Sequence, residues 1–206
     1  MIIVLVGVPG SGKSTQAKCL QNELNIPYVS AGGLLRQEVQ SGSVLGKKLD
    51  ILLSQGKFAP TSLMLTIFEQ RLQKHDVQNG AILDGFPRTL EQAVWFDTFL
   101  PTIQKRVDAV VEITIPYEYL VDRIVGRQIN VATGEIHHKE YNPAPAGAEL
   151  VQRKDDRKDV VDQRYAIYRK KTQPLVDHYQ KQGLVATVSG VGSVNETTQR
   201  ILRVLP

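Results

Sequence analysis

The fold of this chain is decided by residues 1–15, which read MIIVLVGVPGSGKST. Residues 2–6 are an apolar, β-branched run, and residues 7–14 match the pattern G-x-x-x-x-G-K-[ST]. When this pattern lies between a strand and a helix, its glycines let backbone N–H groups curl around phosphate groups. Lys13 would add a positive charge to the same phosphates. The stretch therefore predicts a P-loop after a buried strand, and an incidental glycine-rich turn is the weaker alternative.

Short apolar runs alternate with segments of helical spacing along the rest of the chain. The runs lack polar alternation, which is typical of strands buried on both faces. Alternating strands and helices predict an α/β fold with a parallel sheet of five strands flanked by helices. The predicted strands are 2–6, 26–29, 81–83, 109–115 and 184–188, and the predicted helices are 14–24, 62–75, 90–99, 117–127 and 160–182.

Two segments interrupt the alternation. Residues 30–60 contain short helical pieces separated by glycines, which predicts a small inserted helical subdomain. Residues 129–131 and 136–138 flank the sequence ATGE and predict a hairpin, which the turn-rich NPAPAG at 142–147 follows. A hairpin and a proline-rich loop inside an α/β pattern predict a flap over a site.

Composition limits the class of protein. The 206 residues, 42% hydrophobic and 22% charged, are typical of one globular unit with insertions. Cys19 is the single cysteine, which excludes an intramolecular disulfide and a cysteine-based zinc site. The N-terminus lacks the features of a secretory signal, and no apolar run approaches the ~20 residues of a membrane span. We expect a cytoplasmic protein without membrane association, and a monomer because no heptad pattern is evident.

The charge of the chain is concentrated in one segment. The whole chain has 25 Lys and Arg against 21 Asp and Glu, a net charge of +4. Residues 123–171 contain 11 of these cations and 7 of the acids, so the rest of the chain is neutral. A surplus this small and localised suits a small, highly charged ligand and does not require a nucleic-acid partner.

Asp84 follows the apolar run 81–83 and precedes GFPRT. A carboxylate at the end of a buried strand can orient Mg²⁺-bound water beside a P-loop, and Ser14 or Thr15 can place a hydroxyl there. Helix capping is the alternative role for Asp84. Adjacent His137 and His138 would point to opposite faces of a strand without thiolates, so we expect no zinc.

Arginines provide the second signal for a phosphate ligand. Arg88 offers the bidentate fork that suits a phosphate. Arg123 and Arg127 are four residues apart and would share a helix face. Arg153 and Arg164, eleven apart, would also align if that segment is helical. A solvated charged face is the alternative for each arginine alone, but together with a P-loop they indicate phosphoryl transfer, which needs cations and positioning more than a general base.

Further motifs follow in a fixed order: GVPGSGKSTQ at 7–16, SAGGLLR at 30–36, GKFAP at 56–60, DGFPRTLEQ at 84–92, DRIVGR at 122–127, NP at 142–143 and RKDD at 153–156. The chain thereby resembles the adenylate kinase family of nucleoside monophosphate kinases over essentially its whole length. The resemblance implies a P-loop NTPase core (1–29, 60–125 and 163–206), an inserted AMP-binding subdomain (30–59) and an inserted lid (126–162). It also implies Mg²⁺-dependent conversion of ATP and AMP to two ADP.

The resemblance implies a role for each matching position. Ser14 stands where the family usually has Gly, Gly33 replaces a common Asp, and Ala31 replaces a common Thr. By resemblance, the catalytic residues are Lys13, Arg88, Arg123, Arg153 and Arg164, and Ser14 and Asp84 would reach Mg²⁺ through water. ATP would contact Gly10, Ser11, Gly12, Lys13, Ser14, Thr15, Arg123, Arg127, Ile136, His137 and Gly192. AMP would contact Ala31, Arg36, Lys57, Phe58, Ala59, Gly85, Phe86, Pro87, Arg88, Gln92, Arg153 and Arg164.

Two other functions remain open from the residues. The same chemistry on another base, as in GTP:AMP or UMP/CMP phosphorylation, is the nearer one, because backbone contacts decide base choice. The other is a non-catalytic nucleotide-binding switch. A GTPase-type switch needs an Asn/Thr-Lys-x-Asp motif, and the nearest match here, residues 153–156, begins with Arg.

Overall fold

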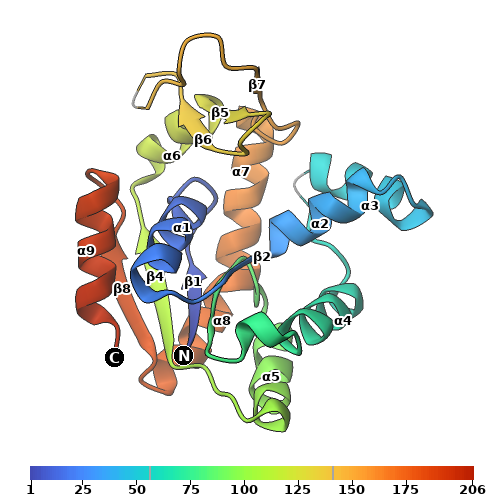
Figure 1. Cartoon of the computed structure of the whole chain (residues 1–206), viewed down its shortest axis with the longest axis vertical. Helices are drawn as coiled ribbons and strands as arrows, with labels where there is room; N and C mark the ends of the chain where they lie inside the picture. The colour runs from blue at the N-terminus through green and yellow to red at the C-terminus, as the bar shows by residue number, and fades with distance from the viewer. Residues whose placement is uncertain (56, 141) are drawn as a thin grey trace.

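A parallel five-stranded sheet forms the centre of the molecule (Figure 1). The computed structural model describes residues 1–55, 57–140 and 142–206. The strand order β2-β3-β1-β4-β8 confirms the predicted α/β fold. Its strands are β1 (Ile2–Val6), β2 (Tyr28–Ser30), β3 (Ala81–Asp84), β4 (Ala109–Thr114) and β8 (Val185–Ser189).

The central strand β1 is covered on both faces. Ile3 and Leu5 pack into a cluster with α1 and α9, whereas Val4 and Val6 pack into the larger cluster with α4, α5 and α8. No residue of β1 is more than 3% exposed, which explains an apolar run without alternation. The covering helices are α1 (Lys13–Leu24), α9 (Val194–Val204), α4 (Thr61–Leu72), α5 (Leu90–Phe99) and α8 (Gln173–Lys181).

Several element boundaries differ from the sequence prediction for local reasons. The strand β2 begins at Tyr28 and not at Ile26, and the preceding Pro27 has no N–H to donate and contributes only its carbonyl, which accepts from Ile82 N. The helix α4 ends at Leu72, and a 3₁₀ turn η1 (His75–Val77) follows. The helix α5 continues directly into the 3₁₀ turn η2 (Leu100–Ile103).

The helix predicted at 160–182 is three segments: α7 (Lys158–Ile167), the π-helical turn η3 (Tyr168–Thr172) and α8. Pro174 explains the interruption. It has no N–H for an α-helical bond, and its ring would clash with the carbonyl four residues earlier. The neighbouring Gln173 N–H instead donates to Tyr168 O, five residues back.

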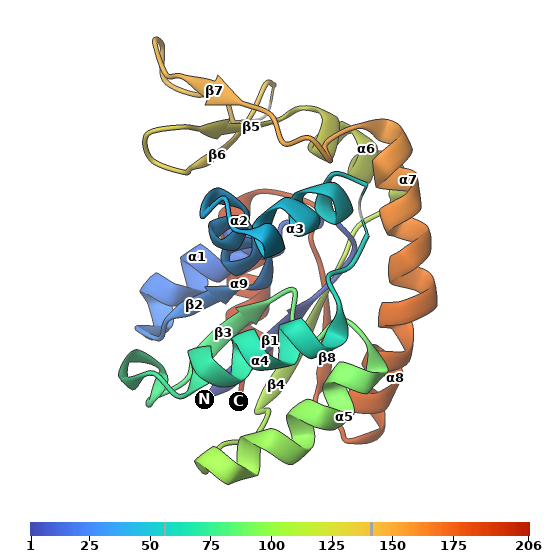
Figure 2. The ribbon, with the colours of Figure 1, turned by 90° about the vertical axis from the view of Figure 1, so that its right-hand side faces the viewer.

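The two predicted insertions project from the carboxyl ends of the strands. Figure 2 shows the strands of residues 126–162, which we call the lid segment, above α2 and α3, with α7 running from them to the core. The predicted hairpin is present as β5 and β6, and β7 adds a third strand that the sequence analysis missed. These elements are α2 (Ala31–Gln40), α3 (Val44–Ser54), α6 (Tyr117–Val125), β5 (Arg127–Asn130), β6 (Ile136–His138) and β7 (Leu150–Val151).

Both chain termini lie at the end of the sheet opposite the lid segment (Figure 1). The carboxyl ends of the parallel strands therefore point toward the lid segment, where ligands bind in open α/β sheets. Among the described residues, no helix combines the length and the apolar character needed to cross a bilayer.

Candidate functional site

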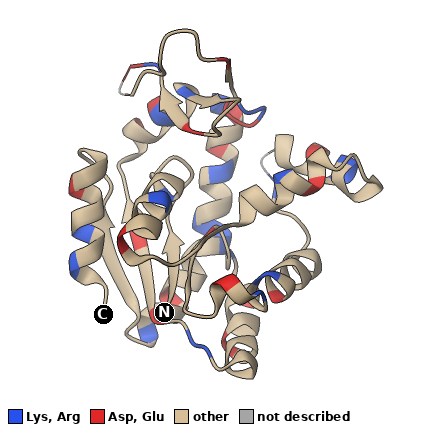
Figure 3. Cartoon of the chain, viewed as in Figure 1, with Lys and Arg blue, Asp and Glu red and all other residues tan. Residues whose placement is uncertain are grey.

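A cleft of about 1080 Å³ lies at the carboxyl ends of the strands. The P-loop forms one wall, and α2, α3, the lid segment and α7 contribute the others. Lys and Arg occur on α1, α2 and α7, which surround the cleft (Figure 3). The molecule therefore presents its phosphate-binding motif and most of the predicted arginines to one cavity.

The side chain of Lys13 folds back onto the P-loop and donates to its backbone carbonyls. Gly12 precedes α1 with φ +97°, a left-handed conformation that a side chain would strain. Lys13 Nζ donates to Gly7 O at 2.7 Å and to Val8 O at 2.9 Å. Burial, opposed by the charge of Asp84, lowers the pKa of Lys13 to about 8. A bound phosphate would favour the charged form of this ammonium, because opposite charges raise the pKa of a lysine.

Asp84 collects two hydroxyl donors on one oxygen. Ser14 Oγ donates to Asp84 Oδ2 at 2.5 Å, and Tyr28 Oη donates to the same atom at 3.0 Å. Asp84 is 6% exposed and lines the cleft. Burial and the adjacent Asp84 charge raise the pKa of Tyr28 to about 12, so its phenol remains a donor at neutral pH.

The residues beside the P-loop fit magnesium. Mg²⁺ takes oxygen ligands, retains several waters and usually binds one or two carboxylates together with substrate phosphates. Asp84 and the Ser14 hydroxyl are such oxygen donors. Within the described part of the chain, no three His, Cys, Asp or Glu residues cluster as a closed metal cage. The donor set therefore suits an ion that is carried in with phosphates and touched through water.

Arg88 lines the cleft and is held by contacts from several elements. Its Nε donates to Gly85 O at 2.8 Å, and its backbone N donates to Gln92 Oε1 at 2.7 Å. Gly85 has φ +81°, and a Cβ there would lie 2.7 Å from Arg88 Nη2, so a side chain at this position would be strained and would displace the guanidinium. Its Cζ lies 5.2 Å from the centre of the Phe58 ring, within cation–π distance. Burial and then the charge of Arg164 lower the pKa of Arg88 to about 10, and it remains a cation at neutral pH.

The other arginines are partly paired with acids. Arg164 Nη1 lies 2.5 Å from Asp155 Oδ2, and Arg127 forms an ion pair with Asp156. Burial and then the charge of Arg127 lower the pKa of Arg153 to about 10, and its Nε has no hydrogen-bond partner among the described residues. Burial also lowers the pKa of Arg36 and of Arg164. The cluster therefore carries surplus positive charge that an anionic ligand would neutralise.

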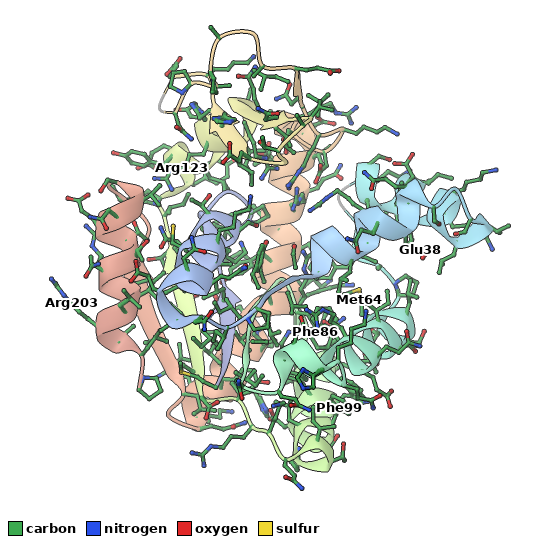
Figure 4. All side chains as sticks on the ribbon, viewed as in Figure 1. Glu38, Met64, Phe86, Phe99, Arg123 and Arg203 are labelled. Atoms are coloured by element: carbon green, nitrogen blue, oxygen red, sulfur yellow. The ribbon has the colours of Figure 1, made fainter. Side chains whose placement is uncertain are left out.

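The helical alignments predicted for these arginines are wrong. Arg123 lies on α6, but this helix ends at Val125, so Arg127 begins strand β5. Arg153 lies in the loop before α7, whereas Arg164 lies on that helix. Tertiary folding, and not helical periodicity, brings the four side chains to one cleft. Figure 4 labels Arg123 close to α6, and its Nη2 donates to Gly190 O at 3.1 Å.

Most predicted site residues line the cleft. They are Gly10, Ser11, Gly12, Lys13, Ser14, Thr15, Arg36, Lys57, Phe58, Asp84, Gly85, Pro87, Arg88, Arg123, Arg127, Ile136, His137, Arg153, Arg164 and Gly192.

Four predicted acceptor-side residues do not reach the cleft wall: Ala31, Ala59, Phe86 and Gln92. Phe86, labelled in Figure 4, is fully buried and stacks on Phe68 with 3.9 Å between ring centres. Gln92 instead accepts the hydrogen bond from Arg88 N. Gly56 of the GKFAP motif lies outside the described residues.

His137 lines the lid side of the cleft. It is 9% exposed, and neither ring nitrogen has a hydrogen-bond partner among the described residues. Its Nε2 lies 3.8 Å from Glu135 Oε2, which is an ion pair only when the ring is protonated. Ile136 lies beside it on β6 and also lines the cleft. Ile136 and His137 therefore line the cleft under the lid segment, although both ring nitrogens of His137 are themselves buried.

The sequence analysis missed several polar residues of the site. Tyr28 and Thr172 make their contacts to residues 56 and 84 positions away, so local sequence carried no signal for them. Asp155 and Asp156 could have been found, because two acids directly after Arg153 and Lys154 in an arginine-rich segment suggest counter-charges.

Comparisons of this chain with known proteins all point to one family. A sequence model described as adenylate kinase matches residues 5–184. An adenylate kinase of Methanothrix thermoacetophila is 39% identical over 212 residues, covering 100% of this chain and 98% of that protein. One from Clostridium kluyveri is 37% identical, covering 97% and 95%, respectively. One from Archaeoglobus fulgidus is also 37% identical, covering 100% and 98%.

Proposed function

The chain belongs to the adenylate kinase family and is a phosphotransferase, and we propose that it transfers the terminal phosphoryl group of ATP to AMP by direct in-line displacement in the cleft. The observation that carries this mechanism is the meeting of a P-loop with two separately anchored arginines, Arg88 and Arg164, in one cavity. A P-loop alone would serve any nucleotide-binding protein. Arginines at its far side provide for a second phosphate-bearing ligand.

The donor would bind on the P-loop side. Backbone N–H groups of residues 10–15 and the N-terminus of α1 would surround the β- and γ-phosphates. Lys13 would turn from its loop carbonyls to these oxygens. Arg123 and Arg127 would bind along the donor from the base of the lid segment, with Ile136, His137 and Gly192 around the adenosine.

The acceptor would bind on the α2–α3 side. Arg36 and Arg88 would hold the AMP phosphate, and Lys57, Phe58, Gly85 and Pro87 would line its pocket. Ala31, Ala59, Phe86 and Gln92 stay predictions for this pocket. For Gln92, the bond to Arg88 N suggests support of the phosphate site from behind.

The reaction needs no general base. The attacking AMP phosphate oxygen is already anionic, so it can form its bond to the γ-phosphorus while the bond to the β–γ bridging oxygen breaks. Arg153 and Arg164 would stabilise the negative charge on the moving phosphoryl group. Mg²⁺, when bound with ATP, neutralises phosphate charge, and Asp84 and Ser14 would orient its water ligands.

The two insertions would exclude water from the cleft. We assign AMP binding to residues 30–59 and the lid to residues 126–162, with the remaining segments as the core. Closure of both over the phosphates would direct transfer to AMP and not to water. The cytoplasmic location and the monomeric state stay predictions from the sequence.

The test is a coupled assay in which ATP is offered with AMP, UMP, CMP or GMP. We expect AMP to be the preferred acceptor, and failure to phosphorylate AMP would overturn the proposal in favour of another base specificity. Lys13→Ala, Arg88→Ala and Arg164→Ala should each lose most turnover while remaining folded by circular dichroism. ATP binding without phosphoryl transfer to any of the four acceptors would instead favour the nucleotide-binding switch, and near-normal turnover in Arg88→Ala would remove Arg88 from the acceptor site.

A further inference from the structure

The π-helical turn η3 carries a buried hydroxyl that points away from its own helix. Thr172 precedes α8 at a position where a threonine side chain commonly caps the helix, but here it makes no such bond. Its Oγ1 donates instead to Arg88 O at 2.8 Å. Thr172 is 5% exposed and lines the cleft.

This contact links two elements that hold like charges. The helix segment α7–η3 carries Arg164, and the loop after β3 carries Arg88. The charge of Arg164 lowers the pKa of Arg88, so the two cations repel each other when no anion lies between them. Their spacing must therefore be imposed by the protein, and the bond from Thr172 to the Arg88 carbonyl joins their supports directly.

Pro174 explains why the helix widens into a π turn that ends at Thr172. Because Pro174 cannot continue the α-helical bonding pattern, the chain widens over residues 168–172 before α8 begins. The turn places Tyr168 and Thr172 inward, with exposures of 7% and 5%, while Arg169 and Lys170 stay exposed. Single π turns inside helices frequently mark functional sites.

We infer that Thr172 is a positioning residue for the acceptor phosphate: its hydroxyl fixes the Arg88 backbone relative to the helix that carries Arg164. This inference rests on the proposed function, in which both arginines contact the phosphates. Thr172 itself touches no reacting atom. It acts by limiting the freedom of Arg88. The other hydrogen-bond partners of Arg88, Gly85 O and Gln92 Oε1, lie in the loop after β3 and on α5, so neither bond joins Arg88 to the helix that carries Arg164.

The test measures AMP binding by calorimetry, without turnover. Thr172→Val removes the hydroxyl but keeps the β-branched shape, and it should weaken AMP binding about 2- to 10-fold, the range expected for one hydrogen bond. ATP binding should not change. Thr172→Ser should bind AMP within about twofold of the wild type, whereas Thr172→Ala, with the same lost methyl but no hydroxyl, should resemble Thr172→Val.

A double-mutant cycle shows whether the effect passes through Arg88. In an Arg88→Lys background, Thr172→Val should change AMP affinity less than about twofold. Equal losses in both backgrounds, or equal AMP affinity of wild type and Thr172→Val, would overturn the inference. Thr102→Val is the matched control, since its hydroxyl also donates to a backbone carbonyl, Phe99 O, but far from Arg88 in the chain.

The same measurements separate this inference from the proposed function. If the wild-type protein does not bind AMP at all, the proposed function fails. If it binds AMP and Thr172→Val binds AMP equally well, only the positioning role fails. The Ser and Ala variants keep the comparison available if Thr172→Val lowers the thermal unfolding midpoint.

Discussion

Lys13 shows at the scale of one residue how a buried cation prepares a phosphate site. Its ammonium is bonded to the P-loop carbonyls of Gly7 and Val8, and burial lowers its pKa to about 8. The free protein therefore begins to lose this charge just above neutral pH. A bound triphosphate restores a pKa closer to the ordinary value of about 10.4, because it favours the charged form.

ATP affinity should therefore depend on pH above this value. Between the pKa of the free protein and the higher pKa of the complex, binding takes up a proton. The dissociation constant should rise by up to about tenfold per pH unit from about pH 8 upward. Calorimetry from pH 6.5 to 9.5, in buffers of different ionisation enthalpy, should detect the proton uptake. Lys13→Met should bind weakly with a flat profile, and wild-type affinity that stays constant to pH 9.5 would contradict the assignment.

Single residues also mark the limit of sequence reasoning. The P-loop, Asp84 and the arginines could be predicted because their residue types and spacing carry the chemistry. Tyr28 and Thr172 could not, because each gains its role only when a distant segment is brought against it. For Gln92, which the resemblance places in the AMP pocket, sequence carried no sign that its side-chain oxygen accepts the Arg88 N–H, and its contact with AMP stays a prediction.

At the scale of elements, the apolar runs predicted the positions of the strands well, and the helical spacing predicted the ends of the helices less well. Gly126 and Pro174 were visible in the sequence, yet the helical spacing of the surrounding residues outweighed them in the predictions for 117–127 and 160–182. In the structure, α6 ends at Val125, directly before Gly126, and a π-helical turn interrupts the second helix just before Pro174. The strand β7 (Leu150–Val151) is too short to give a pattern of its own and depends on pairing with β5.

The packing of α3 on α2 offers a test of the acceptor-side insertion. Gly46 is buried, and a Cβ there would lie 2.3 Å from Glu38 O, a backbone atom that cannot move without shifting α2. Gly46→Ala should therefore separate the two helices, at a cost of about 1–3 kcal/mol. We expect weaker AMP binding, because Arg36 lies on α2, and unchanged binding of ATP.

Calorimetry with each nucleotide separately would measure this difference. Hydrogen exchange should also become faster in α2 and α3 and stay unchanged in the central sheet. Lys48→Ala on the exposed face of α3 is the control and should alter neither measurement. Equal weakening of ATP and AMP binding by Gly46→Ala would show that the two sides of the cleft are not separable in this way.

At the scale of the whole molecule, an ion pair bridges the two insertions across the cleft. Lys154 Nζ, in the lid segment, lies 2.8 Å from Asp50 Oδ2 on α3. The two side chains are 70% and 42% exposed. Such a pair contributes about 0.2–1 kcal/mol. That free energy is enough to shift the equilibrium between open and closed forms of the cleft up to about fivefold, but it is small compared with the stability of a folded domain.

Removing the pair should loosen closure in a salt-dependent manner. Asp50→Asn should raise the KM for AMP about two- to fivefold at low ionic strength. The difference from the wild type should vanish near ~0.5 M salt, where charges on the surface are screened over a few ångströms. Exchanging the charges, with Asp50→Lys and Lys154→Asp together, should restore the wild-type value. Glu69→Gln removes an exposed acid from α4 as a control for net charge. A difference that persists at high salt would show that Asp50 acts through packing of α3 and not through the ion pair.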